Sequence, residues 1–422
     1  MRNTAHLTPE RLKELYEALM TSANAVEAAK RVGVNPKTAQ LHARRLRAKG
    51  IKPFIGAPLP PQTTQAQEPV ERTRAEIHDA SFWRAKARRL ERELAQAEHL
   101  IEQLGGIREV PVDPPRWLAD VSHGTKGRSV IGALVSDVHY GEVIDPEEIN
   151  GVNAFNPEIC ERRMKRYFEA VCGVGQRWAS DTQCEGLLLA LAGDLISGDI
   201  HEELRITNAL TAHEQVSGVV GLLEAGIRQA RKVYPRVHVV AVPGNHGRST
   251  VKPTAKLYAR LSYDIMVASI LADRLRDDDN VTFQFGKAKD QITPVFGRTV
   301  LTTHFDKIGT RGGMGFAGPM LPIVRGTKKI SEQQASVGRR PDLIQGGHYH
   351  TTGNPGNVLA NGSVPGYSEF ADDLRASFEP PQQWLYLLHS KWWLRERAPI
   401  QLEPPGSPEK IRVKAPTTMT EL

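Results

Sequence analysis

The stretch that decides the fold is SVIGALVSDVHYGEV, residues 129–143. It begins with a run of β-branched and aliphatic residues, which is typical of a buried strand, and then changes to Asp137-Val138-His139 and a glycine. In an open α/β sheet the carboxyl ends of the strands lie along one edge, where ligands bind. This stretch therefore predicts an α/β domain whose ligand site begins at Asp137 and His139.

Further segments repeat the same pattern of an apolar run that ends in a glycine-rich or polar turn. GLLLALAGDLISGD contains Asp194, VHVVAVPGNHGR contains Asn245 and His246, TVLTTHFD contains His304, and PDLIQGGHYH contains His348 and His350. Because each polar residue follows a predicted strand, we expect these side chains to converge. Imidazole, carboxylate and amide groups without cysteine suit Mn²⁺, Fe²⁺, Zn²⁺ or Mg²⁺ and argue against a structural zinc site.

In this order the motifs DxH, GD, GNH, a lone histidine and GHxH resemble the calcineurin-like metallophosphoesterase superfamily over residues 129–372. The resemblance implies a β-sandwich flanked by helices, two divalent metal ions with Mn²⁺ expected first, and phosphoester hydrolysis by a metal-bridging hydroxide. It also implies a ligand set: Asp137, His139 and His350 for one ion, Asn245, His304 and His348 for the other, and Asp194 as the bridge. His246 would be the catalytic histidine that protonates the leaving group.

The sequence departs from the pattern of that superfamily at two places. Ser197 occupies the last position of GDxxD, and Gly247 follows GNH where an acid is expected. Neither change removes a metal ligand, but the groups that orient His246 are put in doubt. Arg248, and Arg311 in a later glycine-rich loop, are candidates for contacting a substrate phosphate. The alternatives are a solvated arginine at 248 and a flexible connector around 311.

The net charge of +7 is concentrated at the N-terminus. Residues 1–53 hold 11 Lys and Arg against 4 Asp and Glu, whereas residues 54–422 hold 44 of each sign. A small basic segment beside an electrically balanced body indicates an appended nucleic-acid-binding module.

The basic segment resembles the helix-turn-helix family. Gly33 and Asn35-Pro36 in NAVEAAKRVGVNPKTAQLHARRLRAKG mark the end of one helix and the start of the next. One position departs from the helix-turn-helix pattern: His42 stands where an apolar residue is usual. The second helix carries the candidate DNA contacts Lys37, Gln40, Arg44, Arg45 and Arg47. A basic three-helix domain that binds protein is the alternative.

The organisation expected from these patterns has six parts. They are a helix-turn-helix domain (1–53), a proline-rich linker (54–72), a heptad helix (73–105), a connector (106–128), the metallophosphoesterase domain (129–400) and a tail (401–422). Apolar residues at intervals of three and four over 80–104 predict a coiled-coil homodimer, and the alternative is a helix packed on the body. Residues 357–394 are expected to form strands that close a second sheet.

The function predicted from the sequence is a DNA-directed phosphodiesterase, that is, a nuclease. The alternatives are a phosphomonoesterase or nucleotidase, and a non-catalytic DNA-binding assembly protein.

The start of the chain is too polar for a signal peptide, and no apolar run reaches the roughly 18 residues of a membrane span. We therefore expect a cytoplasmic location without membrane association, in a bacterial host if the gene is phage-encoded, since the architecture resembles phage DNA-metabolism proteins.

Overall fold

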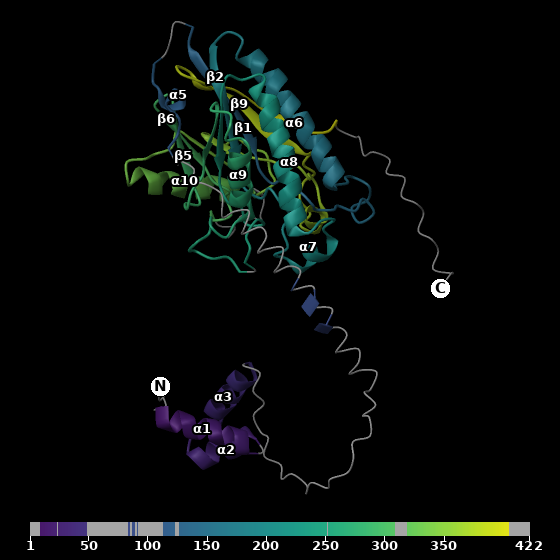
Figure 1. The fold of residues 1–422 in the computed structure, drawn as a ribbon, viewed down its shortest axis with the longest axis vertical. Helices are drawn as coiled ribbons and strands as arrows, with labels where there is room; N and C mark the ends of the chain where they lie inside the picture. The colour runs from purple at the N-terminus through teal and green to yellow at the C-terminus, as the bar shows by residue number, and fades with distance from the viewer. Residues whose placement is uncertain are drawn as a thin grey trace, which may run out of the picture. The chain divides into compact units, whose positions relative to one another are not determined.

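The computed structural model describes residues 9–22, 24–48, 83–84, 87–88, 91, 113–122, 126–250, 252–308 and 319–404. The chain divides into two compact units, residues 1–87 and 88–422 (Figure 1). The predicted linker (54–72), most of the heptad segment, Arg311 and residues 405–422 lie outside the described residues. The coiled-coil dimer therefore stays a prediction.

The first unit contains the helices α1 (Pro9–Thr21), α2 (Ala25–Val32) and α3 (Pro36–Ala48). Asn24 starts α2 by accepting hydrogen bonds from the backbone N–H groups of Val26 and Glu27, each at 3.0 Å. Gly33 ends it in the left-handed conformation, with φ 66°. The helices pack through a small, alanine-rich core: Leu15, Ala18, Leu19, Ala28, Ala29, Ala39 and Ala43.

His42 occupies a core-facing position of α3 without being apolar. It is 9% exposed, and its Nδ1 lies 3.2 Å from the hydroxyl of Tyr16 on α1. The ring edge packs on Tyr16, with the centroids 5.5 Å apart. A polar partner therefore makes the histidine compatible with this core.

The second unit contains a six-stranded sheet with the order β10-β9-β1-β2-β3-β4. Its strands are β1 (Arg128–Val135), β2 (Gln183–Leu191), β3 (Val237–Ala241), β4 (Val281–Gln284), β9 (Gln382–His389) and β10 (Trp393–Gln401). Strands β1 to β4 are parallel, whereas β9 pairs antiparallel with β1 and β10 antiparallel with β9. The parallel strands place their carboxyl ends at one edge of the sheet.

A four-stranded sheet with the order β5-β6-β7-β8 packs against the first. Its strands are β5 (Gln291–Val295), β6 (Arg298–Thr302), β7 (Leu343–Gly346) and β8 (Val358–Ala360). Strands β6, β7 and β8 are parallel, and β5 is antiparallel to β6. This sheet therefore has its own set of parallel carboxyl ends.

Helices cover the outer faces of the two sheets. The six-stranded sheet is covered by α6 (Pro157–Trp178), α8 (Ala212–Arg231) and α9 (Tyr263–Arg274), and α10 (Met320–Ala335) packs on the four-stranded sheet (Figure 1). Short helices lie in connections: α5 (Arg116–Ala119), α7 (Glu202–Thr207) and α11 (Glu369–Asp373). The expected α/β architecture, with two sheets flanked by helices, is confirmed.

Alternation along β1 explains how both faces of the sheet are buried. Ile131, Ala133 and Val135 join the core beneath the helices, whereas Val130 and Leu134 join the core between the sheets. Successive side chains of a strand point to opposite faces, so one apolar run supplies both cores.

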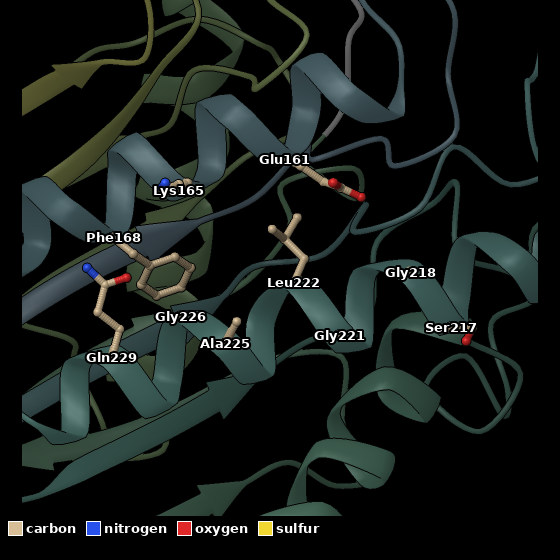
Figure 2. Close-up of a pocket in the computed structure, with 10 residues that line it drawn as sticks. All are labelled: Glu161, Lys165, Phe168, Ser217, Gly218, Gly221, Leu222, Ala225, Gly226 and Gln229. Carbon is tan, nitrogen blue, oxygen red and sulfur yellow. The ribbon is translucent and has the colours of Figure 1, made fainter.

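An open groove of about 460 Å³ lies between α6 and α8 (Figure 2). Gly221 leaves open space on the α8 side, since a Cβ there would meet nothing within 4 Å. Glu161 lines the groove from α6 and accepts a hydrogen bond from the hydroxyl of Tyr140 at 2.8 Å. None of the residues that line this groove is a candidate metal ligand.

One expectation about the body needs correction. The segment 357–394 does not close one sheet, because β8 joins the four-stranded sheet while β9 lies beside β1 in the other. Part of the predicted connector packs on the body through Leu118, which is fully buried. At the start of the segment expected to be a tail, Leu402 is 2% exposed, and Glu403 pairs with Arg163 at 2.8 Å. Among the described helices, none combines the length and apolarity needed to cross a membrane.

A buried histidine in β3 makes the stability of this fold pH-dependent. His238 is fully buried, 2.8 Å from Thr282 Oγ1, and burial lowers its pKa to about 4. The unfolded chain takes up this proton below about pH 6.5, so this contribution to stability is present above that pH and is lost between about pH 6.5 and pH 4. We expect a loss of up to about 3 kcal/mol, at 1.36 kcal/mol per pKa unit. Urea unfolding of wild type and His238→Gln across this range measures it; parallel pH profiles would contradict it.

Candidate metal centre

The candidate ligands all follow the carboxyl ends of strands. Asp137 follows β1, Asp194 follows β2, Asn245 follows β3, His304 follows β6 and His348 follows β7. Because the two sheets pack face to face with these ends at the same side, residues far apart in sequence meet. The structure thus brings together the seven residues that the motifs single out as ligands.

The first group consists of Asp137, His139 and His350, whose ligand atoms lie within 4.8 Å of one another. His139 Nε2 is 3.2 Å from His350 Nε2, and His350 Nε2 is 3.4 Å from Asp137 Oδ1. Burial disfavours a charged ring at His139, but the nearby carboxylate of Glu142 raises its pKa to about 9. Glu142, with the carboxylates of Asp194 and Asp137, therefore favours positive charge at His139.

The second group consists of Asp194, His304 and His348, with ligand atoms again within 4.8 Å of one another. His304 Nε2 lies 2.8 Å from Asp194 Oδ2 and 3.1 Å from Asn245 Oδ1. A third group, formed by His139, Asp194 and His246, connects the first two. Asp194 is thus placed between the two predicted ligand sets.

The donor atoms around His304 fit a divalent cation. Its Nδ1 lies 2.8 Å from the carbonyl oxygen of Ala192, which can only accept, so Nδ1 carries the proton. In the neutral ring Nε2 then presents a lone pair to the oxygens of Asp194 and Asn245. Burial opposes protonation, yet Asp194 raises the pKa of His304 to about 10. A metal cation bound to Nε2 and these oxygens would take the place of the proton that Asp194 otherwise favours, and nitrogen and oxygen donors of this kind suit borderline divalent metals.

The backbone at the site is held in an uncommon conformation. Positive φ angles occur at the candidate ligands Asp137 (51°), His139 (46°), Asp194 (51°), His348 (78°) and His350 (50°). Non-glycine residues in this region cost of the order of 1 kcal/mol or more each and persist only where surrounding contacts impose them. Such outliers cluster at functional sites, which favours a ligand role for these residues.

Two glycines allow the turns to approach the carboxylates. A Cβ at Gly244 would lie 2.1 Å from Asp194 Oδ1, and a Cβ at Gly347 would lie 2.0 Å from Asp137 Oδ2. The glycines of GNH and GGHYH are therefore needed for space beside the carboxylates.

His246 lies at the edge of the cluster. Its backbone N–H donates to Asp194 Oδ1 at 2.7 Å, and its Nδ1 lies 3.0 Å from the carbonyl oxygen of Ser197. The carbonyl fixes the proton on Nδ1 and leaves Nε2 free to exchange a proton. Burial lowers the pKa of His246 to about 4. Ser197 thus orients this ring through its backbone, although its side chain is not the acid that the superfamily pattern has.

The other predicted contact residues have different surroundings. Arg248 is 9% exposed and donates to the carbonyl oxygens of Asn245 at 2.7 Å and Thr250 at 3.0 Å, so it supports the GNH turn. Its contact with a phosphate stays a prediction, and Arg311 lies outside the described residues. In the first unit Lys37, Gln40 and Arg44 are exposed on α3, which also carries Arg45 and Arg47 in its backbone range.

Sequence patterns missed three residues that contact the site. Ser136 Oγ donates to Asp137 Oδ2 at 2.5 Å, and Glu142 Oε2 lies 3.1 Å from His139 Nδ1. Both are close to a motif, and their spacing could have indicated them. Asp264 contacts the turns of two motifs from the start of α9, and no local pattern identifies it.

The second unit is therefore a two-sheet α/β domain with an Asp- and His-rich cluster able to hold metal ions. No protein-family model and no curated protein matches the chain.

Among solved structures, the chain is similar to a provisionally assigned 5′-nucleotidase from Staphylococcus aureus, solved with α-ketoglutarate, at a TM-score of 0.31 and 13% identity, over 65% of this chain and 55% of that one. It is also similar to a phosphopantetheinyl hydrolase from Mycobacterium tuberculosis, at a TM-score of 0.23 and 11% identity, over 56% of this chain and 90% of that one. The chain spans 55% of the length of the nucleotidase. Both TM-scores are too low to assign an activity to this chain.

Proposed function

We propose that the chain is a metal-dependent phosphodiesterase that cleaves DNA. The observation that carries the proposal is the convergence of the two histidine–aspartate groups around Asp194, at the carboxyl ends of strands from both sheets. Carboxylates and imidazoles suit borderline divalent ions, and a carboxylate placed between two ligand groups is able to serve a pair of them.

The geometry of the site supports a metal-holding role for seven of its residues and a proton-transfer role for His246. Asp137, His139 and His350 would hold one ion, His304, His348 and Asn245 the other, and Asp194 would serve both. Bound divalent ions, Mn²⁺ first among those the donors suit, supply charge neutralisation and a hydroxide nucleophile for phosphoester hydrolysis. Ser197 fixes the Nδ1 proton of His246, so Nε2 is the atom that takes up and releases a proton once the negative charge of a bound phosphate raises the pKa of the ring from about 4. A diester leaving group benefits from that proton because an alkoxide is a poor leaving group.

The preference for DNA is supported by the first unit. Lys37, Gln40 and Arg44 lie three and four residues apart on α3, so they share one exposed face. Arginine and lysine supply phosphate contacts, and a glutamine can reach a base edge. We propose that residues 1–53 form a helix-turn-helix domain that brings DNA to the metal centre.

A substrate panel tests the proposed activity. Linear and circular duplex DNA, single strands, bis-p-nitrophenyl phosphate and mono-p-nitrophenyl phosphate are each offered with Mn²⁺, Mg²⁺ or Zn²⁺. We expect hydrolysis of the diester and of DNA to exceed that of the monoester. A clear preference for the monoester would favour the phosphatase or nucleotidase hypothesis, and binding of DNA without any hydrolysis would favour the assembly protein.

Removal of the basic segment should separate DNA recognition from catalysis. A version starting near Pro69 should bind duplex DNA more weakly and with less salt dependence, since each lost phosphate contact lowers the log–log salt slope by about 0.9. Hydrolysis of bis-p-nitrophenyl phosphate should change little, because every candidate ligand lies in the second unit. Fluorescence anisotropy at several salt concentrations measures the first effect.

Point variants of the full chain control for the truncation. Lys37→Ala with Arg44→Ala removes two exposed cations from α3, and Lys328→Ala with Lys329→Ala removes two exposed cations from α10. The α3 pair should lower the salt slope by up to about 2, and the α10 pair should leave it unchanged. Equal slopes in all versions would contradict delivery of DNA by the first unit.

A further inference from the structure

Asp264 connects two turns of the metal centre from outside every motif. It lies near the start of α9 and is fully buried. Its Oδ1 accepts the backbone N–H of Leu195 at 2.9 Å, and its Oδ2 accepts the backbone N–H of Gly244 at 2.8 Å. Leu195 follows Asp194 and Gly244 precedes Asn245, so one carboxylate joins the turns that present these two candidate ligands.

The carboxylate of Asp264 also occupies the space beside Gly247. A Cβ built on Gly247 would lie 2.4 Å from Asp264 Oδ2, which leaves no room for a side chain there. The backbone N–H of Tyr263 donates to the carbonyl oxygen of Gly247 at 2.6 Å, which fixes the start of α9 against the GNH turn. Position 247 is where the superfamily pattern has an acid. The space next to this position is thus filled by an acid from a different part of the chain.

Local support holds Asp264 itself in place. Ser262 caps α9 by accepting the backbone N–H of Asp264 at 3.2 Å, and its hydroxyl lies 3.3 Å from Asp264 Oδ2. The Asp264 side chain therefore accepts hydrogen bonds from the β2 turn, the β3 turn and its own helix start. A buried carboxylate that accepts hydrogen bonds from three segments holds those segments in fixed relative positions.

We infer that Asp264 is a positioning residue of the metal centre, which fixes the separation of Asp194 and Asn245 and replaces the acid missing at position 247. The inference deepens the proposed function and rests on it, because Asp194 and Asn245 are metal ligands only within that proposal. The role that competes with it is purely structural, in which Asp264 satisfies buried N–H groups of the fold. The two roles differ in what a conservative substitution does to metal affinity.

Asp264→Asn is the first test. The amide can accept a hydrogen bond through its oxygen but not through its nitrogen, so one of the two turns loses its acceptor while the volume is kept. We expect Mn²⁺ affinity, measured by calorimetry on the full chain, to fall by about 10- to 100-fold, as for other outer-shell partners. Asp342→Asn is the matched control, since Asp342 accepts the backbone N–H of Thr299 at 2.9 Å away from the cluster.

A relocation of the acid tests the same inference without relying on one variant. Asp264→Ala alone should weaken Mn²⁺ binding, and Gly247→Asp alone should do so too, because its side chain collides with Asp264. The double variant removes the collision and returns an acid to position 247, so it should bind Mn²⁺ more tightly than either single variant. A purely structural role for Asp264 predicts no such recovery.

The outcomes separate this inference from the proposed function. Wild-type Mn²⁺ affinity in Asp264→Asn, or a double variant no better than Asp264→Ala, would overturn the positioning role whatever the enzyme hydrolyses. A wild-type chain that binds Mn²⁺ but hydrolyses neither ester would overturn the phosphodiesterase, while the comparison of affinities would still decide the role of Asp264.

Discussion

Asp194→Ala should remove metal-dependent hydrolysis altogether and weaken metal binding by more than about 100-fold. Loss of an outer-shell partner costs about 10- to 100-fold in metal affinity, and a carboxylate shared between two ligand groups should cost more. Asp194 lies between the two candidate ligand groups, because its two oxygens face different partners. Oδ1 accepts the backbone N–H of His246 at 2.7 Å, and Oδ2 lies 2.8 Å from His304 Nε2. Calorimetry with Mn²⁺ and turnover of bis-p-nitrophenyl phosphate measure the two effects.

The matched control for Asp194→Ala is Asp199→Ala. Asp199 lies in the same connection after β2 but is exposed and belongs to none of the candidate metal groups among the described residues. It should keep both metal binding and turnover. Near-wild-type turnover of Asp194→Ala after removal of metal and reconstitution with Mn²⁺ would refute the assigned centre, provided that circular dichroism shows the variant to be folded.

The candidate ligand cluster could be predicted from the sequence because a short local pattern marks each of its residues. Each candidate residue directly follows a short apolar run, and parallel strands bring their carboxyl ends to one edge without further information. Asp137 and Asp194 are an example: β1 and β2 are parallel neighbours, and the backbone N–H of Asp137 donates to the carbonyl oxygen of Gly193 at 3.1 Å. The strand pattern thus sufficed to predict that these residues approach one another.

Features that depend on long-range packing could not be predicted in this way. The strand around Tyr386 has the same apolar composition whichever sheet it joins, and only its antiparallel register opposite Gly132 places it beside β1. Asp264 is similar, since a helix-starting Ser-x-Asp is common and only tertiary structure brings its carboxylate to Gly244. Local patterns indicated the candidate ligands, but the contacts that hold their turns together come from distant segments.

The proposed role of His246 differs from that of the candidate ligands, and its surroundings support the difference. The carbonyl oxygen of Ser197 at 3.0 Å fixes the Nδ1 proton, and the ring packs edge-on against His139 with centroids 4.6 Å apart. Because the residue is half-buried and its tautomer is set, Nε2 is the atom at which a proton can be gained or lost. A residue with this role contributes to leaving-group departure rather than to metal affinity.

His246→Ala should therefore retain Mn²⁺ binding within a few-fold of wild type but lose about 10²- to 10⁴-fold in turnover of a diester with a poor leaving group. With a good leaving group such as p-nitrophenolate the loss should be much smaller, because less protonation is needed in the transition state. A series of diesters of graded leaving-group pKa measures the difference, with His213→Ala as a control, since His213 is a half-buried histidine at the start of α8 outside the candidate metal groups. Equal losses across the series would show that His246 does not donate a proton. A large loss of Mn²⁺ affinity would instead place it among the ligands, as its proximity to Asp194 and His139 permits.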